Sequence, residues 1–218
     1  MESVRYAAQL PGEGLLCEPC RRVPPQFARA VAFGVYRDGL REMVHLLKYN
    51  GMRPLAAPLG QLLAQAMLQL REPGQAGGAN FTAVAADDAL LIAVPLYAAR
   101  ERQRGCNQAR LLAESARREL AERGWRLSPA HHVLQRVRDT ETQFALSPTG
   151  RRRNLRGAFA VAAGAQLAGR EVVLVDDIYT TGATARECAR VLRRAGAARV
   201  WVATLARAQV EMVARWQP

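Results

Sequence analysis

The sequence has no apolar run long enough to cross a membrane, and its first residues lack the charged-then-apolar order of a signal peptide. We therefore expect a cytoplasmic protein. Two widespread phosphate-binding motifs are also missing, G-x-x-x-x-G-K-[ST] and G-x-G-x-x-G. Their absence argues against a P-loop nucleotide hydrolase and against a dinucleotide-binding Rossmann domain.

Aromatic residues are scarce, at 6% of 218 residues, whereas basic residues are in excess, with 31 Lys and Arg against 19 Asp and Glu and a net charge of +12. Such a charge favours anionic partners, which are phosphorylated small molecules or nucleic acid, without choosing between them. Single-stranded nucleic acid is usually held by stacking on aromatic side chains. The composition therefore counts against a dedicated single-strand binder.

Half of the residues are hydrophobic, enough for one main domain with a small appendage. Apolar patterning predicts strands at 30–36, 90–96, 132–137, 158–162, 171–176 and 199–206, and helices from Asp38 to Gly51, from Pro54, at 107–123 and at 183–195. Apolar strands alternating with helices predict an α/β fold whose mostly parallel sheet carries helices on both faces. We divide the chain into an irregular arm at 1–29, a helical hood-like segment at 30–89 and a core at 90–218.

One stretch, at 171–184, carries the chemistry and reads EVVLVDDIYTTGAT. Its apolar strand runs into Asp176 and Asp177, at the rim where open α/β sheets bind ligands. The following turn offers unpaired amides and the hydroxyls of Thr180, Thr181 and Thr184, which suit a phosphate, and Gly182 removes a Cβ from its path. Paired acids suit sugar hydroxyls or a hydrated Mg²⁺. A 5-phosphorylated ribose combines these features, although a simple helix cap is the alternative reading.

This stretch closely resembles the ribose-phosphate loop of type I phosphoribosyltransferases. Three further segments resemble one branch of that superfamily, the ComF-type competence proteins: LLKYNGM at 46–52, VPLYAARERQRGCNQARLLA at 94–113 and RVRDTETQFALSPTGRRRNLRGAF at 136–159. The likeness covers roughly residues 15–206. It implies a type I phosphoribosyltransferase fold.

The resemblance also implies roles for single residues. Asp176 and Asp177 would hold the ribose hydroxyls of phosphoribosyl pyrophosphate (PRPP), with Mg²⁺ nearby, directly or through water. The 5-phosphate would be cradled by Thr180, Thr181, Gly182, Ala183 and Thr184. The pyrophosphate would lie at Pro95, Leu96 and Tyr97, with Arg100 and Arg104 as cations. A flexible loop at 138–157 would close over the site with Arg138, Arg151, Arg152 and Arg153, although a charge run facing solvent is an equally good interpretation.

One departure concerns Thr180, which stands where purine-salvage members carry an aspartate as general base. This argues against hypoxanthine-guanine salvage. The acceptor stays unidentified, and we expect residues 30–70 to help build its pocket.

ComF-type proteins commonly begin with a zinc ribbon of two C-x-x-C pairs, but only Cys17 and Cys20 form such a pair here. Tetrahedral zinc needs four ligands, and His45 is an unsupported third. The site has decayed, the true start lies upstream of Met1, or a second chain supplies ligands. We favour a lost or incomplete zinc site.

The resemblance thus implies a Mg²⁺-dependent enzyme that transfers ribose 5-phosphate from PRPP to an unidentified acceptor with release of pyrophosphate, in DNA uptake and competence or in nucleotide metabolism. The alternative is a non-catalytic PRPP- or nucleotide-binding module that handles single-stranded DNA during natural transformation. A PRPP-sensing transcriptional regulator ranks last because no helix-turn-helix pattern is evident. Dimers are common among such proteins, so the resemblance suggests a homodimer, although the sequence does not determine how many chains assemble.

Overall fold

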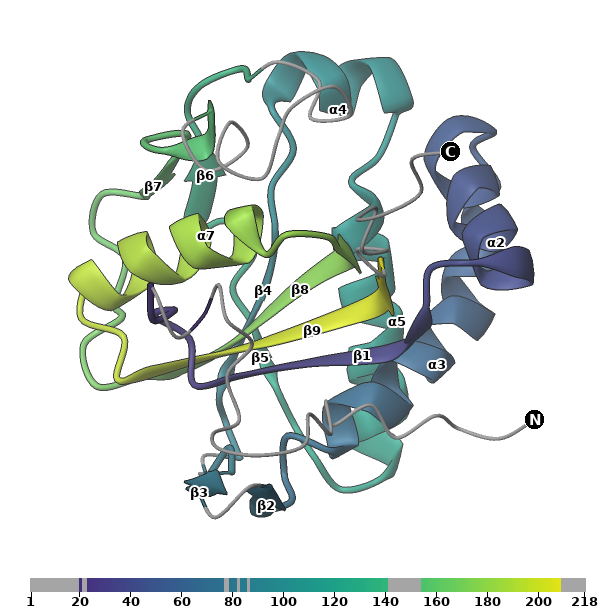
Figure 1. Cartoon of the computed structure of the whole chain (residues 1–218). Helices are drawn as coiled ribbons and strands as arrows, with labels where there is room; N and C mark the ends of the chain where they lie inside the picture. The colour runs from purple at the N-terminus through teal and green to yellow at the C-terminus, as the bar shows by residue number, and fades with distance from the viewer. Residues whose placement is uncertain are drawn as a thin grey trace, which may run out of the picture.

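A computed structural model describes residues 20, 23–76, 79–81, 83–85, 87–140 and 154–208. At its centre is a five-stranded sheet in the order β1-β9-β8-β4-β5, with every neighbouring pair parallel (Figure 1). The strands are β1 (Arg29–Val35), β4 (Leu90–Ala93), β5 (Ser128–Pro129), β8 (Glu171–Tyr179) and β9 (Arg199–Arg207). The predicted parallel sheet is confirmed.

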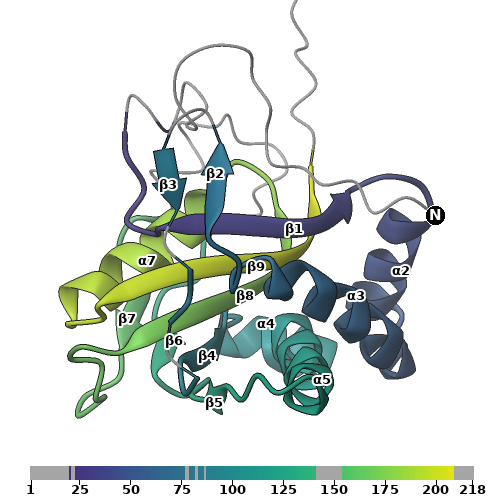
Figure 2. The same ribbon diagram turned by 90° about the horizontal axis from the view of Figure 1, so that it is seen from below.

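The two faces of this sheet are covered by different elements, as the turned view makes plain (Figure 2). On one face lie α3 (Ala56–Leu68) and α5 (Gln108–Glu122), packed on Val173 and Val175 of β8. On the other lies α7 (Ala183–Arg194), packed on Val172 and Leu174. Alternate residues of one apolar strand therefore feed two separate cores, as a sheet buried on both faces requires.

Smaller elements surround this sandwich. They are α2 (Asp38–Tyr49), the 3₁₀ turn η1 (Arg53–Leu55), α4 (Ala98–Arg104), a hairpin of β2 (Gly74–Ala76) and β3 (Ala79–Phe81), and a pair formed by β6 (Leu134–Arg136) and β7 (Phe159–Val161). The predicted strands at 132–137 and 158–162 exist. They pair antiparallel with each other, outside the parallel sheet.

Three elements were not predicted from the sequence. The hairpin β2–β3 falls in a stretch we expected to be a loop, β5 has only two residues, and α4 has no buried residue and hence no apolar stripe. Within the described residues, no helix combines the length and apolar character that a membrane crossing requires.

The segment 30–89 supplies β1 at the edge of the sheet and α3 beside α5. Its role as a hood, and the division of the chain into arm, hood and core, stay predictions.

Candidate functional site

The site lies at the carboxyl edge of the sheet, where parallel strands release their loops together. Strand β4 runs beside β8, and the N–H of Val94 donates to the carbonyl of Val175 at 2.8 Å. Pro95–Tyr97 and α4 therefore leave the sheet next to the turn that follows β8. Two segments that the resemblance assigns to one ligand are thus neighbours.

The turn after β8 is not helical up to Gly182, and α7 begins at Ala183 without a side-chain cap. The first intrahelical bond runs from the N–H of Arg186 to the carbonyl of Gly182, at 2.9 Å. The N–H groups of 183–185 consequently have no partner within the helix. The buried hydroxyl of Thr181 also finds no hydrogen-bond partner among the described residues. Together these unused donors favour an anion.

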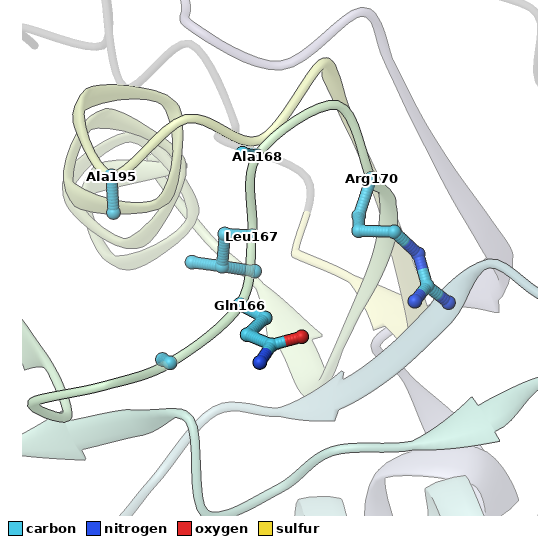
Figure 3. Close-up of a pocket in the computed structure, with 6 residues that line it drawn as sticks. Gln166, Leu167, Ala168, Arg170 and Ala195 are labelled. Carbon is cyan, nitrogen blue, oxygen red and sulfur yellow. The ribbon is translucent and has the colours of Figure 1, made fainter.

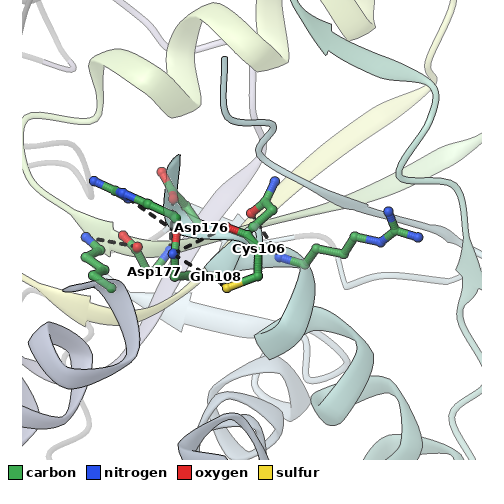
Figure 4. A network of polar contacts seen from close by, with 8 residues as sticks. Cys106, Gln108, Asp176 and Asp177 are labelled. Carbon is green, nitrogen blue, oxygen red and sulfur yellow. Dashed lines mark hydrogen bonds and ion pairs between the residues drawn. The ribbon is translucent and has the colours of Figure 1, made fainter. Parts of the chain in front are cut away.

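The two acids beside this turn are tied to each other and to α2 (Figure 4). The N–H of Asp177 donates to Oδ1 of Asp176 at 2.9 Å. Lys48, near the end of α2, places its Nζ 2.9 Å from Oδ2 of Asp177, with the two side chains 16% and 14% exposed. The LLKYNGM segment therefore contributes a cation to the acid pair, which our residue assignments had missed.

Burial, and after it the charge of Asp177, raise the pKa of Asp176 to about 7 against the opposing pull of Lys48 and Arg136. Burial acts to lower the pKa of Lys48, but Asp177 and, after it, Asp176 together outweigh burial and leave that pKa above its ordinary value. Near neutral pH the pair therefore carries less than its full double negative charge, and Lys48 offsets part of the remainder.

A second cation, Arg136 of β6, also faces the site. Its Nη2 donates to the hydroxyl of Thr140, its guanidinium lies 5.5 Å from the ring centre of Phe159, and its buried Nε has no partner among the described residues. Burial lowers the pKa of Arg136, as does Arg100, while Asp139 and Asp176 oppose this. Strand alternation could have found this residue, because Arg136 follows buried Leu134 by two positions.

Arg138, which the sequence assigned to the flexible loop, makes different contacts. Its Nη2 donates to the carbonyls of Asn154 and Arg156, both at 2.8 Å. Arg138 thereby joins the two sides from which the loop leaves. The other predicted loop cations, Arg151, Arg152 and Arg153, lie outside the described residues, as does Cys17.

The two arginines of α4 reach in different directions. Arg100 donates to the carbonyl of Thr140 at 2.5 Å and pairs with Asp139 at 3.2 Å, on the β6 side. Arg104 lies over the ring of Tyr49 on α2, with 5.2 Å from guanidinium carbon to ring centre. The edge of the sheet is therefore bordered by cations from α2, α4 and β6.

Tyr179 occupies the space in front of Gly182. A Cβ on Gly182 would lie 2.2 Å from the Tyr179 hydroxyl, and the glycine has a φ of +73°. The backbone conformation and the tyrosine both require glycine at this position. Its role of leaving room for a phosphate stays a prediction.

His131, to which the sequence assigned no role, supports the end of β4. Its Nδ1 accepts from the N–H of Ala93 at 3.0 Å, and its Nε2 lies 2.9 Å from Oε1 of Glu114. Burial lowers the pKa of His131 in spite of Glu114. The imidazole is therefore neutral, with its proton on Nε2 directed at the carboxylate.

Nothing in the described part of the chain forms a zinc site, since no three His, Cys, Asp or Glu side chains gather there. Sγ of Cys20 accepts from Nη2 of Arg186 at 2.9 Å, and the ring of His45 packs on Tyr49 at 4.6 Å between centres.

Magnesium prefers different ligands from zinc. The carboxylates of Asp176 and Asp177 are the hard oxygen donors that a hydrated Mg²⁺ prefers, so the donor set fits that ion.

A hollow of about 470 Å³ lies away from this edge, next to Arg170 at the start of β8 (Figure 3). It is lined by Ala165, Gln166, Leu167, Ala168, Arg170 and Ala195. None of these is a predicted site residue.

Comparison with known proteins defines the class. Residues 129–214 match the family described as phosphoribosyl transferase domain. Together with the parallel sheet, this identifies a type I phosphoribosyltransferase fold.

Individual relatives narrow the class further. DNA utilization protein YhgH of Salmonella typhi is 36% identical over 193 residues, covering 88% of this chain and 78% of that protein. Competence protein F of Haemophilus influenzae is 32% identical over 193 residues, which again cover 88% of this chain and 78% of that protein. Competence protein ComFC of Bacillus subtilis is 38% identical over 109 residues, or 50% of this chain and 40% of that protein. The chain belongs to the ComF-type family of phosphoribosyltransferase-like proteins.

Proposed function

We propose that the chain binds PRPP with Mg²⁺ at the carboxyl edge of the sheet and transfers its ribose 5-phosphate to an acceptor, releasing pyrophosphate. The observation that carries the proposal is the junction of β8 and α7. There, an unpartnered buried Thr181 hydroxyl and the free amides of α7 lie directly after Asp176 and Asp177. An anion next to a diol is the ligand that such a junction suits.

Each segment then has a role in this proposal. The turn 180–184 holds the 5-phosphate, and the acids accept hydrogen bonds from the ribose hydroxyls. Pro95–Tyr97 receives the pyrophosphate, with Arg100 and Arg104 as cations. When bound, Mg²⁺ neutralises charge on that leaving group. The described residues position the ligand and supply electrostatic stabilisation, which this displacement at a sugar carbon needs more than a protein nucleophile.

The acceptor side of the site is proposed to lie at the end of α2. Tyr49, which is 54% exposed, lies against Arg104 and directly follows Lys48 in the chain. Met52, three residues further on, is 43% exposed. A planar ring stacks well on such a surface. This agrees with the expectation that residues 30–70 help build the acceptor pocket, and Thr180 continues to argue against hypoxanthine-guanine salvage.

The decisive experiment is calorimetric titration of PRPP with Mg²⁺ into the wild type and the Asp176→Asn/Asp177→Asn variant. We expect the variant to fold and to lose PRPP binding. A matched control is Asp87→Asn/Asp88→Asn, another adjacent acid pair, whose ion pairs with Arg71 and Arg170 are exposed. The site assignment is wrong if the Asp176/Asp177 variant keeps wild-type affinity.

Catalysis needs a separate assay, because binding alone does not establish transfer. Pyrophosphate release from PRPP is measured across a panel of nucleobases and amines. Turnover with one of them supports the enzyme, and no turnover with any counts against it.

The second candidate function is binding of single-stranded DNA, favoured by the net charge of +12 and by relatives named for competence and DNA utilization. On this basis we propose a role in competence or DNA uptake. Binding of an oligo-dT strand is measured at several salt concentrations. A log–log plot with a clear negative slope supports electrostatic binding, and a flat one contradicts it. The cytoplasmic location and the homodimer stay predictions.

A further inference from the structure

The ion pair between Lys48 and Asp177 is more buried than the other ion pairs among the described residues. Of the ion pairs found among the described residues, Lys48–Asp177 is the one in which both side chains are less than one-fifth exposed. Enclosing two charges costs desolvation that their attraction only partly repays, so such a pair is weak evidence for a stabilising role. Its position on the acid pair suggests a task in the site.

Helix α2 does not need this ion pair to be anchored. Val44 and Leu47 on the same helix are 0% and 1% exposed and belong to the core cluster that includes α3 and α5. Their burial holds α2 in place. Lys48 therefore extends from a helix that is already packed.

The four carboxylate oxygens of the acid pair are used unequally. Oδ1 of Asp176 accepts the N–H of Asp177, and Oδ2 of Asp177 faces Lys48. The other two oxygens accept no hydrogen bond from the described residues. When both carboxylates are ionised, two acceptors are thus left for two donors, which is the number that a sugar diol presents.

We propose that Lys48 is the resident cation of the acid pair: it occupies the carboxylate oxygen of Asp177 that a free divalent ion would take, and so reserves the pair for a diol. This inference rests on the proposed function for the identity of that diol. An ammonium and a divalent ion repel each other strongly when they share one carboxylate oxygen. The pair consequently gains little affinity for free metal, and the phosphates of the ligand would supply the remaining oxygen donors for Mg²⁺.

Lys48 is in this view a positioning residue. It directs Asp177 and selects against free metal, and it need not touch the reacting atoms. A merely structural lysine would not control metal affinity, which is the property to measure.

The test uses Mn²⁺ alone, without PRPP, and follows free Mn²⁺ by electron paramagnetic resonance in the full-length chain. We expect weak binding by the wild type and by Lys48→Arg, which keeps the cation. Lys48→Met should bind Mn²⁺ at least about tenfold more tightly, because the competing charge is gone. Adding Asp177→Asn to Lys48→Met should remove that gain.

Equal Mn²⁺ affinity in wild type and Lys48→Met overturns the proposal, as does an equal gain in Lys48→Arg. Circular dichroism checks folding, and Lys48→Gln replaces Lys48→Met if the latter does not fold. The outcome is independent of PRPP titrations. Loss of the proposed function would appear as absent PRPP binding by the wild type, while failure of this inference would appear only in the metal assay.

Discussion

Gly60 of α3 lies directly against Ser115 of α5. A Cβ on Gly60 would come within 2.3 Å of the Ser115 Cβ and 3.0 Å of the backbone nitrogen of Ala116. The Ser115 hydroxyl also donates to the carbonyl of Ala57 at 3.3 Å. The two helices that cover one face of the sheet can approach this closely only because a glycine stands at their crossing.

Gly60→Ala should therefore force α3 and α5 apart and lower the free energy of unfolding by about 2 kcal/mol or more. Urea denaturation measures the change. Gly39→Ala on α2 is the matched control, since nothing lies within 4 Å of its Cβ position and alanine favours a helix. A Gly60→Ala variant as stable as Gly39→Ala would contradict the close crossing.

Gly182→Ala should destabilise the turn for two reasons, its φ of +73° and the collision with Tyr179. We expect a loss of about 1–3 kcal/mol in unfolding free energy. Gly124→Ala isolates the first reason, because Gly124 has a φ of +83° and open space around it. Combining Gly182→Ala with Tyr179→Ala should relieve the collision only. If Gly182→Ala and Gly124→Ala lower the free energy of unfolding equally, the predicted collision with Tyr179 does not occur.

Asp176→Asn should change how stability depends on pH. The raised pKa of about 7, against 3.8 when unfolded, means that the folded chain keeps a proton between these values that the unfolded chain has released. The contribution of the Asp176 carboxyl to the free energy of unfolding is therefore fully present below about pH 4. It is lost as pH rises to about 7. Asparagine has no such loss and still accepts the N–H of Asp177.

The unfolding free energy of Asp176→Asn minus that of wild type should accordingly rise by about 4 kcal/mol between pH 4 and pH 8. Denaturation curves at several pH values measure this difference, which cancels the contributions of groups that do not interact with Asp176. A difference that stays constant with pH would show that the Asp176 carboxyl titrates normally.

His131 should make the fold sensitive to acid in the opposite direction. Because its folded pKa is lowered, the unfolded chain takes up the proton first, and stability present above pH 6.5 is lost as pH falls below it. Protonation also ends the bond from Ala93 to Nδ1. His131→Gln should cost about 1–3 kcal/mol at pH 7.5 and less at pH 5. The exposed neighbour His132→Gln is the control, and equal costs at both pH values would contradict this role.

Much of the fold could be predicted because its signals are local. The apolar run before Asp176 predicts a strand whichever segments pack beside it. Gly182 followed by a helical pattern predicts the turn into α7. The helices after Asp38 and Pro54 were found in the same way. By contrast, β5 has two residues and α4 has no buried face, so neither carries a pattern to read.

The acid pair and the phosphate-binding character of the turn after it also follow from residues adjacent in the chain. Which cation meets those acids does not. Lys48 reaches Asp177 from a distant helix, Arg136 rather than Arg138 faces Asp176, and β6 pairs with β7 rather than with the sheet. These choices depend on long-range packing, which places charges from remote segments around one sheet edge and sets their burial. The local sequence determined which functional groups the loop after β8 carries. Only the tertiary structure decided which cations neutralise its two acids, because those cations come from remote segments.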